Sequence, residues 1–136
     1  MRIQVLFFGI LSTLSLQATV YNFHEVVKQE KNAPTVVLAT LLKYPILVVK
    51  FYKTGCPSCE AIASIYSRAG AHYATEQVLF LEIEHPKFKK IPLSQTVRTL
   101  PTIIIFKNGR EVARLKGERE ISYKSLTTTI NNISTL

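Results

Sequence analysis

Cysteine chemistry is the first question that this chain raises, because its two cysteines, Cys56 and Cys59, stand three positions apart in the stretch KTGCPSCEA. A pair at this spacing can do one of three things. It can exchange disulfides with another molecule, form a purely structural cross-link, or supply two of the four ligands of a tetrahedral zinc site. Most of what the sequence indicates about function depends on this choice.

The zinc and structural alternatives are the weaker two. Zinc needs two further ligands, and none of the three histidines, His24, His72 and His85, stands in paired spacing with another ligand. A structural disulfide that encloses so few residues contributes little, because its effect on the unfolded chain grows with the length of the enclosed loop. We therefore expect redox chemistry at the cysteines and predict no metal and no cofactor.

The redox alternative has a physical mechanism. Cys56 follows an apolar stretch typical of a strand, and Pro57 suits the first position of a helix. A thiolate at a helix start faces unpaired N–H groups and the positive end of the helix dipole, which lower its pKa and raise its reactivity. Cys59 lies on the same helix face, within reach of a disulfide. These are the predicted catalytic residues: Cys56 attacks a partner disulfide, and Cys59 resolves the mixed disulfide.

Two strands and a helix are expected to position these cysteines. Residues 45–52 and 78–84 are β-branched and nearly continuously apolar, which favours strands buried on both faces, as in a parallel sheet. Between them, apolar residues recur at helical spacing and predict a helix over residues 57–74. A parallel strand pair joined by a crossover helix places Cys56 just after a central strand.

The segment before the first strand is predicted to be largely helical. Residues 20–32 suggest a short amphipathic helix, although residues 20–23 also fit an edge strand. A second helix is predicted from Pro34 to about Lys43, because proline is tolerated at the first helical position, where its missing N–H costs little.

The segment after the second strand is predicted to hold a hairpin between two helices. A short helix is expected near residues 93–97 and a closing helix over residues 121–133. Asn108-Gly109, within the stretch TIIIFKNGREVARLKG, is the strongest short signal for a hairpin turn. The whole order is strand, helix, strand, helix, strand, strand, helix, which predicts an α/β sandwich around a mixed sheet.

Length and composition predict one compact domain. The chain has 136 residues and is 47% hydrophobic, enough for a core. Its net charge is +8, but the basic residues are scattered apart from Lys87, Lys89 and Lys90, which we interpret as part of a solvated loop. No motif that combines aromatic and basic residues accompanies them, so nucleic acid is not an expected partner.

The N-terminal segment has the pattern of a signal peptide. Arg2 supplies the positive region, residues 5–16 an apolar stretch that is short for a membrane span, and Ala18 a small residue before the cleavage point. We predict a signal peptide over residues 1–18 and an exported domain over residues 19–136, periplasmic or secreted, where disulfides persist. The alternative is an uncleaved anchor, the one case in which membrane contact is expected.

With the strand, the Cys-Pro-Ser-Cys motif and the helix in place, the sequence resembles the thioredoxin family over residues 32–133. ILVVKFYKTGCPSC is similar to the active-site strand and motif of that family, LPTIIIFKNGREV to its cis-proline segment, and Gly117 to the glycine after the last strand. The resemblance implies a thioredoxin-like three-layer sandwich in which Pro101 is cis. It also implies that the backbone of Leu100 pairs with the substrate chain, so that Leu100 and Pro101 position the substrate. The alternative is an ordinary proline at a strand entry.

The chain also departs from the family pattern. Gly55 replaces the usual Trp before the first cysteine, Pro57-Ser58 replaces Gly-Pro, and Ser64 replaces the proline that kinks the active-site helix. Lys50 stands where typical thioredoxins carry a buried acid that helps to deprotonate the second cysteine. These differences do not favour housekeeping thioredoxin activity, and they leave dithiol chemistry intact.

Lys50, the candidate for tuning a cysteine pKa, has two interpretations. Strand alternation puts it on one face with Val48 and Tyr52, in a segment suited to burial. In the first interpretation, its stem runs along the core and its ammonium reaches water. In the second, the amine lies beneath the dithiol. A charged amine would there stabilise thiolate and make the disulfide more oxidising, and a neutral one would act as the base that deprotonates Cys59.

The sequence thus predicts an exported thiol–disulfide oxidoreductase that exchanges disulfides with protein substrates. Its expected partners are protein thiols and disulfides, together with a redox partner that recycles the dithiol. Oxidase, reductase and isomerase activity all stay open, because potentials across the fold differ by about 150 mV. The alternative function is a non-enzymatic thioredoxin-fold module that binds partners and carries a passive disulfide.

Overall fold

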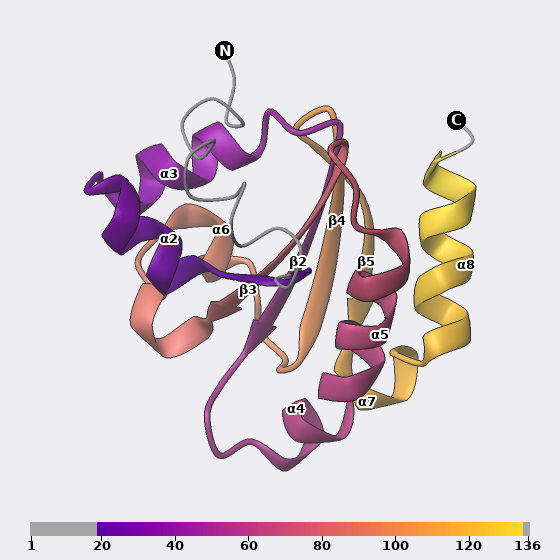
Figure 1. Ribbon diagram of the computed structural model, residues 1–136. Coiled ribbons are helices and arrows are strands. Elements are labelled where there is room, and N and C mark those ends of the chain that lie inside the picture. The colour runs from indigo at the N-terminus through magenta and orange to yellow at the C-terminus, as the bar shows by residue number, and fades with distance from the viewer. Residues whose placement is uncertain (1–18, 135–136) are drawn as a thin grey trace.

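The computed structural model describes residues 19–134, so the signal peptide predicted over residues 1–18 lies outside the described residues. Within residues 19–134, no helix is both long and apolar enough to cross a membrane. Figure 1 shows a central sheet with helices on either side of it.

The sheet has five strands in the order β1-β3-β2-β4-β5. They are β1 (Tyr21–Asn22), β2 (Ile46–Tyr52), β3 (Val78–Glu84), β4 (Thr102–Lys107) and β5 (Arg110–Lys116). Strand β3 pairs in parallel with both β1 and β2, whereas β4 pairs antiparallel with β2 and β5. The sheet is therefore mixed, as predicted, and β2 is its central strand.

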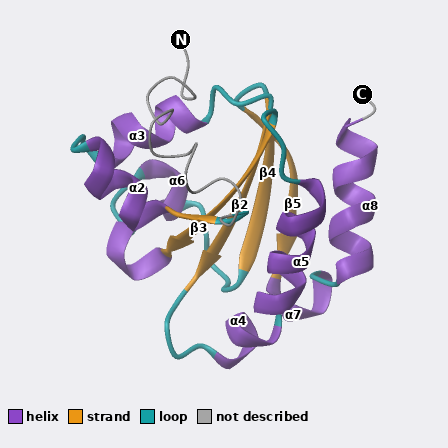
Figure 2. Cartoon of the chain, viewed as in Figure 1, coloured by secondary structure: helices purple, strands orange, loops and turns teal. Residues whose placement is uncertain are grey.

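Helices cover both faces of the sheet, which gives the three-layer sandwich that the resemblance implied (Figure 2). One layer holds α2 (Phe23–Glu30), α3 (Pro34–Leu41), the 3₁₀ helix η1 (His85–Phe88) and α6 (Pro92–Gln95). The other holds α5 (Ala63–Tyr73) and α8 (Tyr123–Ser134), with the short helices α4 (Pro57–Ala61) and α7 (Gly117–Glu120) at one end.

Strand β2 is buried on both faces, which explains its nearly continuous apolar sequence. Leu47, Val49 and Phe51 belong to the core beneath α2 and α3. Ile46 and Val48, which alternate with them, belong to the core beneath α5 and α8. Burial of one apolar side chain of this size stabilises the fold by about 1.5–3 kcal/mol. Strand β2 is therefore stably packed where the loop that leads to the cysteines begins.

The helix predicted over residues 57–74 is in fact two helices, α4 and α5. The break is at Ile62, whose backbone leaves the helical region with φ of −101° and ψ of 2°. Ile62 is buried and packs in the core, and neither proline nor glycine marks the break in the sequence. The consequence is that the turn that carries the cysteines is a separate short helix.

The N-terminal segment contains both elements that the sequence left as alternatives. Strand β1 is an edge strand, and α2 begins directly after it. Asn22 caps α2, because its side-chain oxygen accepts a hydrogen bond from the backbone N–H of Glu25 at 3.3 Å. Further along, the helix expected near residues 93–97 is α6, whereas no sequence pattern predicts η1 or α7.

The hairpin between β4 and β5 turns at Asn108 and Gly109, as predicted. Their φ values of 53° and 82° both lie in the left-handed region, which a type I′ turn requires and which these two residue types adopt most readily. In the antiparallel pairing of β4 with β2, Thr102 lies opposite Phe51. The start of β4 is therefore at the same end of the sheet as the end of β2.

Candidate active site

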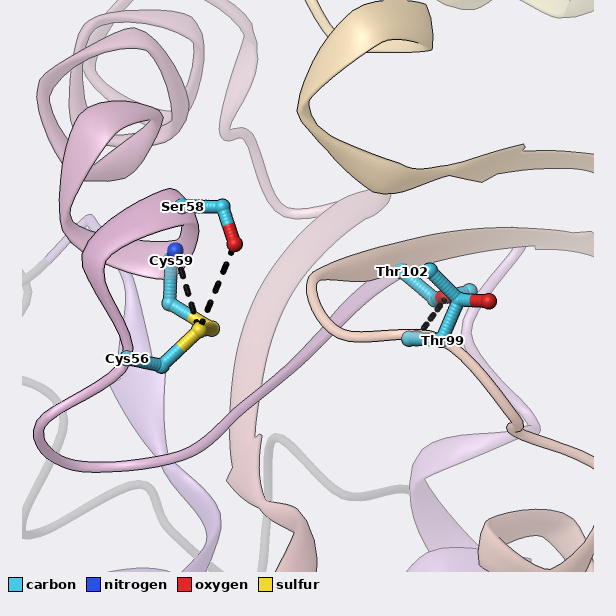
Figure 3. The surroundings of a disulfide bond; sticks show 5 residues. All are labelled: Cys56, Ser58, Cys59, Thr99 and Thr102. Atoms are coloured by element: carbon cyan, nitrogen blue, oxygen red, sulfur yellow. Dashed lines mark hydrogen bonds between the residues drawn. A yellow bond between two sulfur atoms is a disulfide. The ribbon is translucent and has the colours of Figure 1, made fainter.

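Cys56 and Cys59 form a disulfide after the loop that follows β2 (Figure 3). Cys56 is the N-cap of α4, Pro57 occupies the first helical position as predicted, and the two cysteine Cα atoms are 5.2 Å apart. Both cysteines are almost buried, with 9% of Cys56 and 4% of Cys59 exposed. The two sulfurs therefore differ in their place on the helix more than in their exposure.

The start of α4 supplies hydrogen-bond donors to the Cys56 sulfur. The backbone N–H of Cys59 donates to Cys56 Sγ at 3.2 Å, so the sulfur takes the place of the Ser or Asp oxygen of an ordinary N-cap. The Ser58 hydroxyl oxygen lies 3.5 Å from the same sulfur. Donors that face a sulfur favour its thiolate over its thiol, so this arrangement suits Cys56 for the role of nucleophile.

A side-chain contact ties the active-site loop to the neighbouring strand. Thr54 Oγ1 donates to Glu84 Oε2 at 2.9 Å, and Lys87 Nζ lies 3.3 Å from Glu84 Oε1. The hydrogen bond from Thr54, aided by Lys87, holds the pKa of Glu84 below its usual value. Gly55 follows with φ of 78°, a left-handed conformation that glycine adopts without strain. This loop conformation places Cys56 at the N-cap of α4.

The segment before β4 lies near the cysteines. The Leu100-Pro101 peptide bond is cis, as the resemblance implied. Thr102 Oγ1 donates to the carbonyl oxygen of Thr99 at 2.6 Å, and the N–H of Gly117 donates to the carbonyl oxygen of Pro101 at 2.7 Å. Figure 3 shows both threonines in the surroundings of the disulfide. Thr99 and Thr102 flank the turn that contains Leu100 and Pro101, and the role of these two residues toward a substrate stays a prediction.

Lys50 does not reach open water. It is 6% exposed, and its ammonium lies 3.2 Å from Oε1 of Glu82, its register partner on β3. The ammonium also lies over the rings of Tyr52 and Tyr66, 5.2 and 5.0 Å from their centroids. The interpretation in which this amine reaches water is therefore wrong, because a carboxylate and two aromatic rings hold it inside the protein.

The Lys50–Glu82 pair lies against α5, because the Lys50 ammonium is 5.0 Å from the centroid of the Tyr66 ring. The Tyr66 hydroxyl lies 2.9 Å from the carbonyl oxygen of Val48, which fixes the position of α5 along β2. That the amine lies beneath the dithiol stays a prediction.

Two tyrosines border this ion pair. Burial raises the pKa of Tyr66 well above its usual value, and the charge of Glu82 adds to the effect. Burial, and then Glu82, likewise raise the pKa of Tyr52, whose hydroxyl accepts a hydrogen bond from Asn22 at 3.4 Å. Both phenols are therefore neutral at physiological pH, and their rings solvate the Lys50 ammonium.

Sequence reasoning missed two acidic residues of the site, Glu82 and Glu84. Both lie on β3, in the stretch VLFLEIE, and alternate with apolar residues that face the other core. A glutamate inside an otherwise apolar strand was the available signal. That signal does not identify the partner, because the pairing of Glu82 with Lys50 depends on the register of β3 against β2.

The histidines take part in interactions away from the cysteines. The imidazole rings of His24 and His72 lie next to aromatic rings. His85 Nε2 lies 3.0 Å from the carbonyl oxygen of Ser94. In the part of the chain that the structure describes, no group of three or more His, Cys, Asp or Glu side chains is placed to hold a metal ion.

Comparisons with known proteins agree with one another. The family model described as Thioredoxin matches residues 15–132. The chain is 33% identical over 76 residues to the thioredoxin-like protein slr0233 of Synechocystis, a match that covers 56% of this chain and 70% of that protein. It is 30% identical over 79 residues to thioredoxin-1 of Saccharomyces cerevisiae, across 58% of this chain and 75% of that one. The solved structure of thioredoxin NaTrxh from Nicotiana alata superposes with a TM-score of 0.67 at 22% identity, over 85% of this chain and 92% of that chain.

Proposed function

Since the chain belongs to the thioredoxin family of protein-disulfide oxidoreductases, we propose that it is exported and exchanges disulfides with exported proteins through its Cys-Pro-Ser-Cys dithiol. The observation that carries this proposal is the Cys56–Cys59 disulfide, placed at the start of α4 with hydrogen-bond donors around the Cys56 sulfur. Fold membership alone would leave the activity open, because function belongs to the site rather than to the fold.

The proposed exchange proceeds in two displacements. The Cys56 thiolate attacks one sulfur of a protein disulfide and forms a mixed disulfide, and the other substrate sulfur leaves as a thiolate. The Cys59 thiolate then attacks the Cys56 sulfur, which forms the Cys56–Cys59 disulfide and releases the second substrate thiolate. Two electrons pass from the dithiol to the substrate, and the two thiol protons end on the substrate thiolates through water. Every step runs in reverse when the substrate is a dithiol.

The turn before β4 is the proposed docking point for the substrate chain. Its hydrogen bonds, from Thr102 to Thr99 and from Gly117 to Pro101, hold the Leu100 backbone in a fixed place near the disulfide. A substrate that pairs with the backbone of Leu100 would present its own disulfide beside Cys56. Holding the two reactants in this way lowers the barrier, because the displacement needs a defined alignment of the three sulfurs.

Export is proposed from the sequence alone, through the signal-peptide pattern of residues 1–18. Mass spectrometry of the protein recovered from its host tests it. Cleavage predicts a mature chain that begins at residue 19 and fractionates outside the cytosol. A chain that keeps residues 1–18 and sediments with membranes identifies the segment as an anchor, and a full-length chain in the cytosol contradicts export.

Trapping of substrates tests the exchange itself. In a Cys59→Ala variant the mixed disulfide forms and is not resolved, so exported proteins should remain covalently attached through Cys56. A Cys56→Ser/Cys59→Ala variant is the matched control, because it keeps the surface and lacks the nucleophile. Reducing and non-reducing electrophoresis, followed by mass spectrometry, identify the adducts. If the single variant captures no more protein than the double variant, the chain is a binding module with a passive disulfide.

A further inference from the structure

A pocket of about 380 Å³ lies between the start of α3 and the segment that follows β3. Three of the residues that line it are apolar and buried or half-buried, and form its floor: Pro34, Phe88 and Ile91. Its rim carries three exposed lysines: Lys87, Lys89 and Lys90. The sequence alone indicates a solvated loop for these lysines, whereas the structure gathers them around one hollow. We call this feature, residues 86–91 together with Pro34, the lysine pocket.

The lysine pocket has an excess of positive charge. The ammonium of Lys87 lies 3.3 Å from Oε1 of Glu84. Within residues 19–134, neither Lys89 nor Lys90 has a carboxylate at ion-pair distance. Helix α3 adds to the positive potential, because its start at Pro34 has no side-chain cap and no acidic residue in the first turn. An acidic group is therefore the complementary ligand for the rim of this pocket.

The lysine pocket is connected with the active-site loop. Strands β2 and β3 are parallel, and Tyr52 at the end of β2 is the register partner of Glu84 at the end of β3. The segments that follow these two residues therefore leave the sheet at neighbouring strand ends, as Figure 1 shows. Glu84 contacts both segments, because it pairs with Lys87 and accepts a hydrogen bond from Thr54. One ion pair and one hydrogen bond thus link the rim of the pocket to the loop that leads to Cys56.

We propose that the lysine pocket docks an acidic segment of the proteins with which this chain exchanges disulfides, with one apolar side chain of that segment on the pocket floor. The proposal rests on the proposed function and deepens it, because it names a chemical class of substrate. Carboxylates of the segment pair with Lys89 and Lys90. A projecting segment fills a hollow of this size, which lies in the range of ligand pockets, about 300–1,000 Å³, whereas a flat lipid surface does not.

Binding of short peptides tests the docking site without any redox step. Two fluorescently labelled peptides that lack cysteine, Glu-Glu-Phe-Glu and its neutral counterpart Gln-Gln-Phe-Gln, are titrated with the full chain, and fluorescence anisotropy gives each Kd. We expect the acidic peptide to bind about threefold to tenfold more tightly, because exposed ion pairs contribute modestly. Higher salt should reduce this preference, because it screens exposed charges.

Charge reversal identifies the lysines that act. The Lys89→Glu/Lys90→Glu variant should lose the preference for the acidic peptide. The Arg110→Glu/Lys124→Glu variant is the matched control, because it changes the net charge equally at exposed residues outside the lysine pocket, and it should keep the preference. The proposal is overturned if the parent binds both peptides equally, or if the Lys89→Glu/Lys90→Glu variant keeps the preference. Equal peptide binding together with binding to phosphatidylglycerol vesicles would assign the lysines to a membrane surface and also overturn it.

Disulfide peptides that carry the same two tails connect the pocket with exchange. Each tail is joined by a flexible Gly-Ser linker to a peptide with one internal disulfide, and dithiothreitol supplies the electrons. The parent should reduce both with similar kcat and with a KM about threefold to tenfold lower for the acidic tail. Equal KM values would contradict the docking site and leave the proposed function standing. Reduction of neither peptide beyond the rate of the Cys56→Ser variant would contradict the proposed function and leave the binding result standing.

Discussion

The ammonium of Lys50 and the carboxylate of Glu82 lie 3.2 Å apart on adjacent strands, with the ammonium over the ring of Tyr66 on α5. The Lys50 side chain is 8% exposed and the Glu82 side chain 29%, so one end of the pair is dehydrated and the other keeps contact with solvent. A charge left inside a protein without its partner is costly, whereas replacement of both partners by apolar residues is often neutral for stability. One substitution and two substitutions therefore have different expected effects.

Lys50→Met is expected to lower the free energy of unfolding by about 2–3 kcal/mol at neutral pH, because it leaves the Glu82 carboxylate beside Tyr52 and Tyr66 without its cation. Urea denaturation followed by circular dichroism measures the change. The Lys50→Met/Glu82→Leu variant is the control and should recover most of the loss. A single variant as stable as the parent would show that the ion pair contributes nothing.

The same substitution tests whether Lys50 tunes the dithiol. If the amine lies beneath the dithiol, Lys50→Met removes a positive charge from that place, so the thiolate pKa should rise and the redox potential should become more negative. The rise should stay below about one unit, since Glu82 already opposes the charge. Glu82→Gln should shift both quantities in the opposite direction. Thiolate absorbance and the glutathione equilibrium measure the two quantities.

Two other results have a defined meaning for Lys50. Slower resolution of the mixed disulfide with little change in potential would identify Lys50 as a neutral base for Cys59. If the pKa, the potential and the resolution rate all match the parent, Lys50 is a structural residue of the core and has no effect on the chemistry.

Alkylation should distinguish the two cysteines. In the reduced protein at neutral pH, brief treatment with iodoacetamide is expected to modify Cys56 before Cys59. Hydrogen-bond donors converge on the Cys56 sulfur and favour its thiolate, whereas the two cysteines are similarly buried, so the expected order rests on this activation. Peptide mass spectrometry gives the ratio of the two adducts. Equal labelling would undo the assignment of nucleophile and resolving thiol.

Thr54→Val should reduce the dependence of stability on acid pH. Glu84 has a lowered pKa in the folded protein, chiefly through the hydrogen bond from Thr54, against a usual value of 4.5. A lowered folded-state pKa stabilises the fold above the unfolded value, and this contribution is lost as pH falls through the folded value. The variant should therefore be less stable than the parent at neutral pH, and the difference should shrink below about pH 4. A difference that is constant with pH would exclude this carboxylate as its cause.

Local patterns were enough to predict the elements that carry the cysteines. The apolar run of β2 predicts its burial because both faces of the strand are covered, and Asn108-Gly109 predicts the hairpin because only a few residue types tolerate left-handed backbone. The placement of Pro57 at the helix start follows for a similar local reason. In each case, the residues that cause the structural feature lie within one short stretch of the chain.

The remaining features depend on contacts between distant parts of the chain. The helix break at Ile62 occurs without a proline or glycine that would predict it from the sequence. Ile62 is buried in a core formed by several elements. The pairing of Lys50 with Glu82 follows from the register of two strands, which no local pattern reports. The same holds for the contact of Thr54 with Glu84, which joins residues 30 positions apart.

Insulin reduction is the most direct test of the central claim, that the Cys56–Cys59 dithiol exchanges disulfides with proteins. With dithiothreitol as the electron donor, catalytic amounts of the parent protein should accelerate the precipitation of reduced insulin chains. The Cys56→Ser variant should give only the uncatalysed rate, since it lacks the nucleophile. If the parent protein is no faster than the Cys56→Ser variant, the claim is contradicted, and the disulfide is a passive part of the fold.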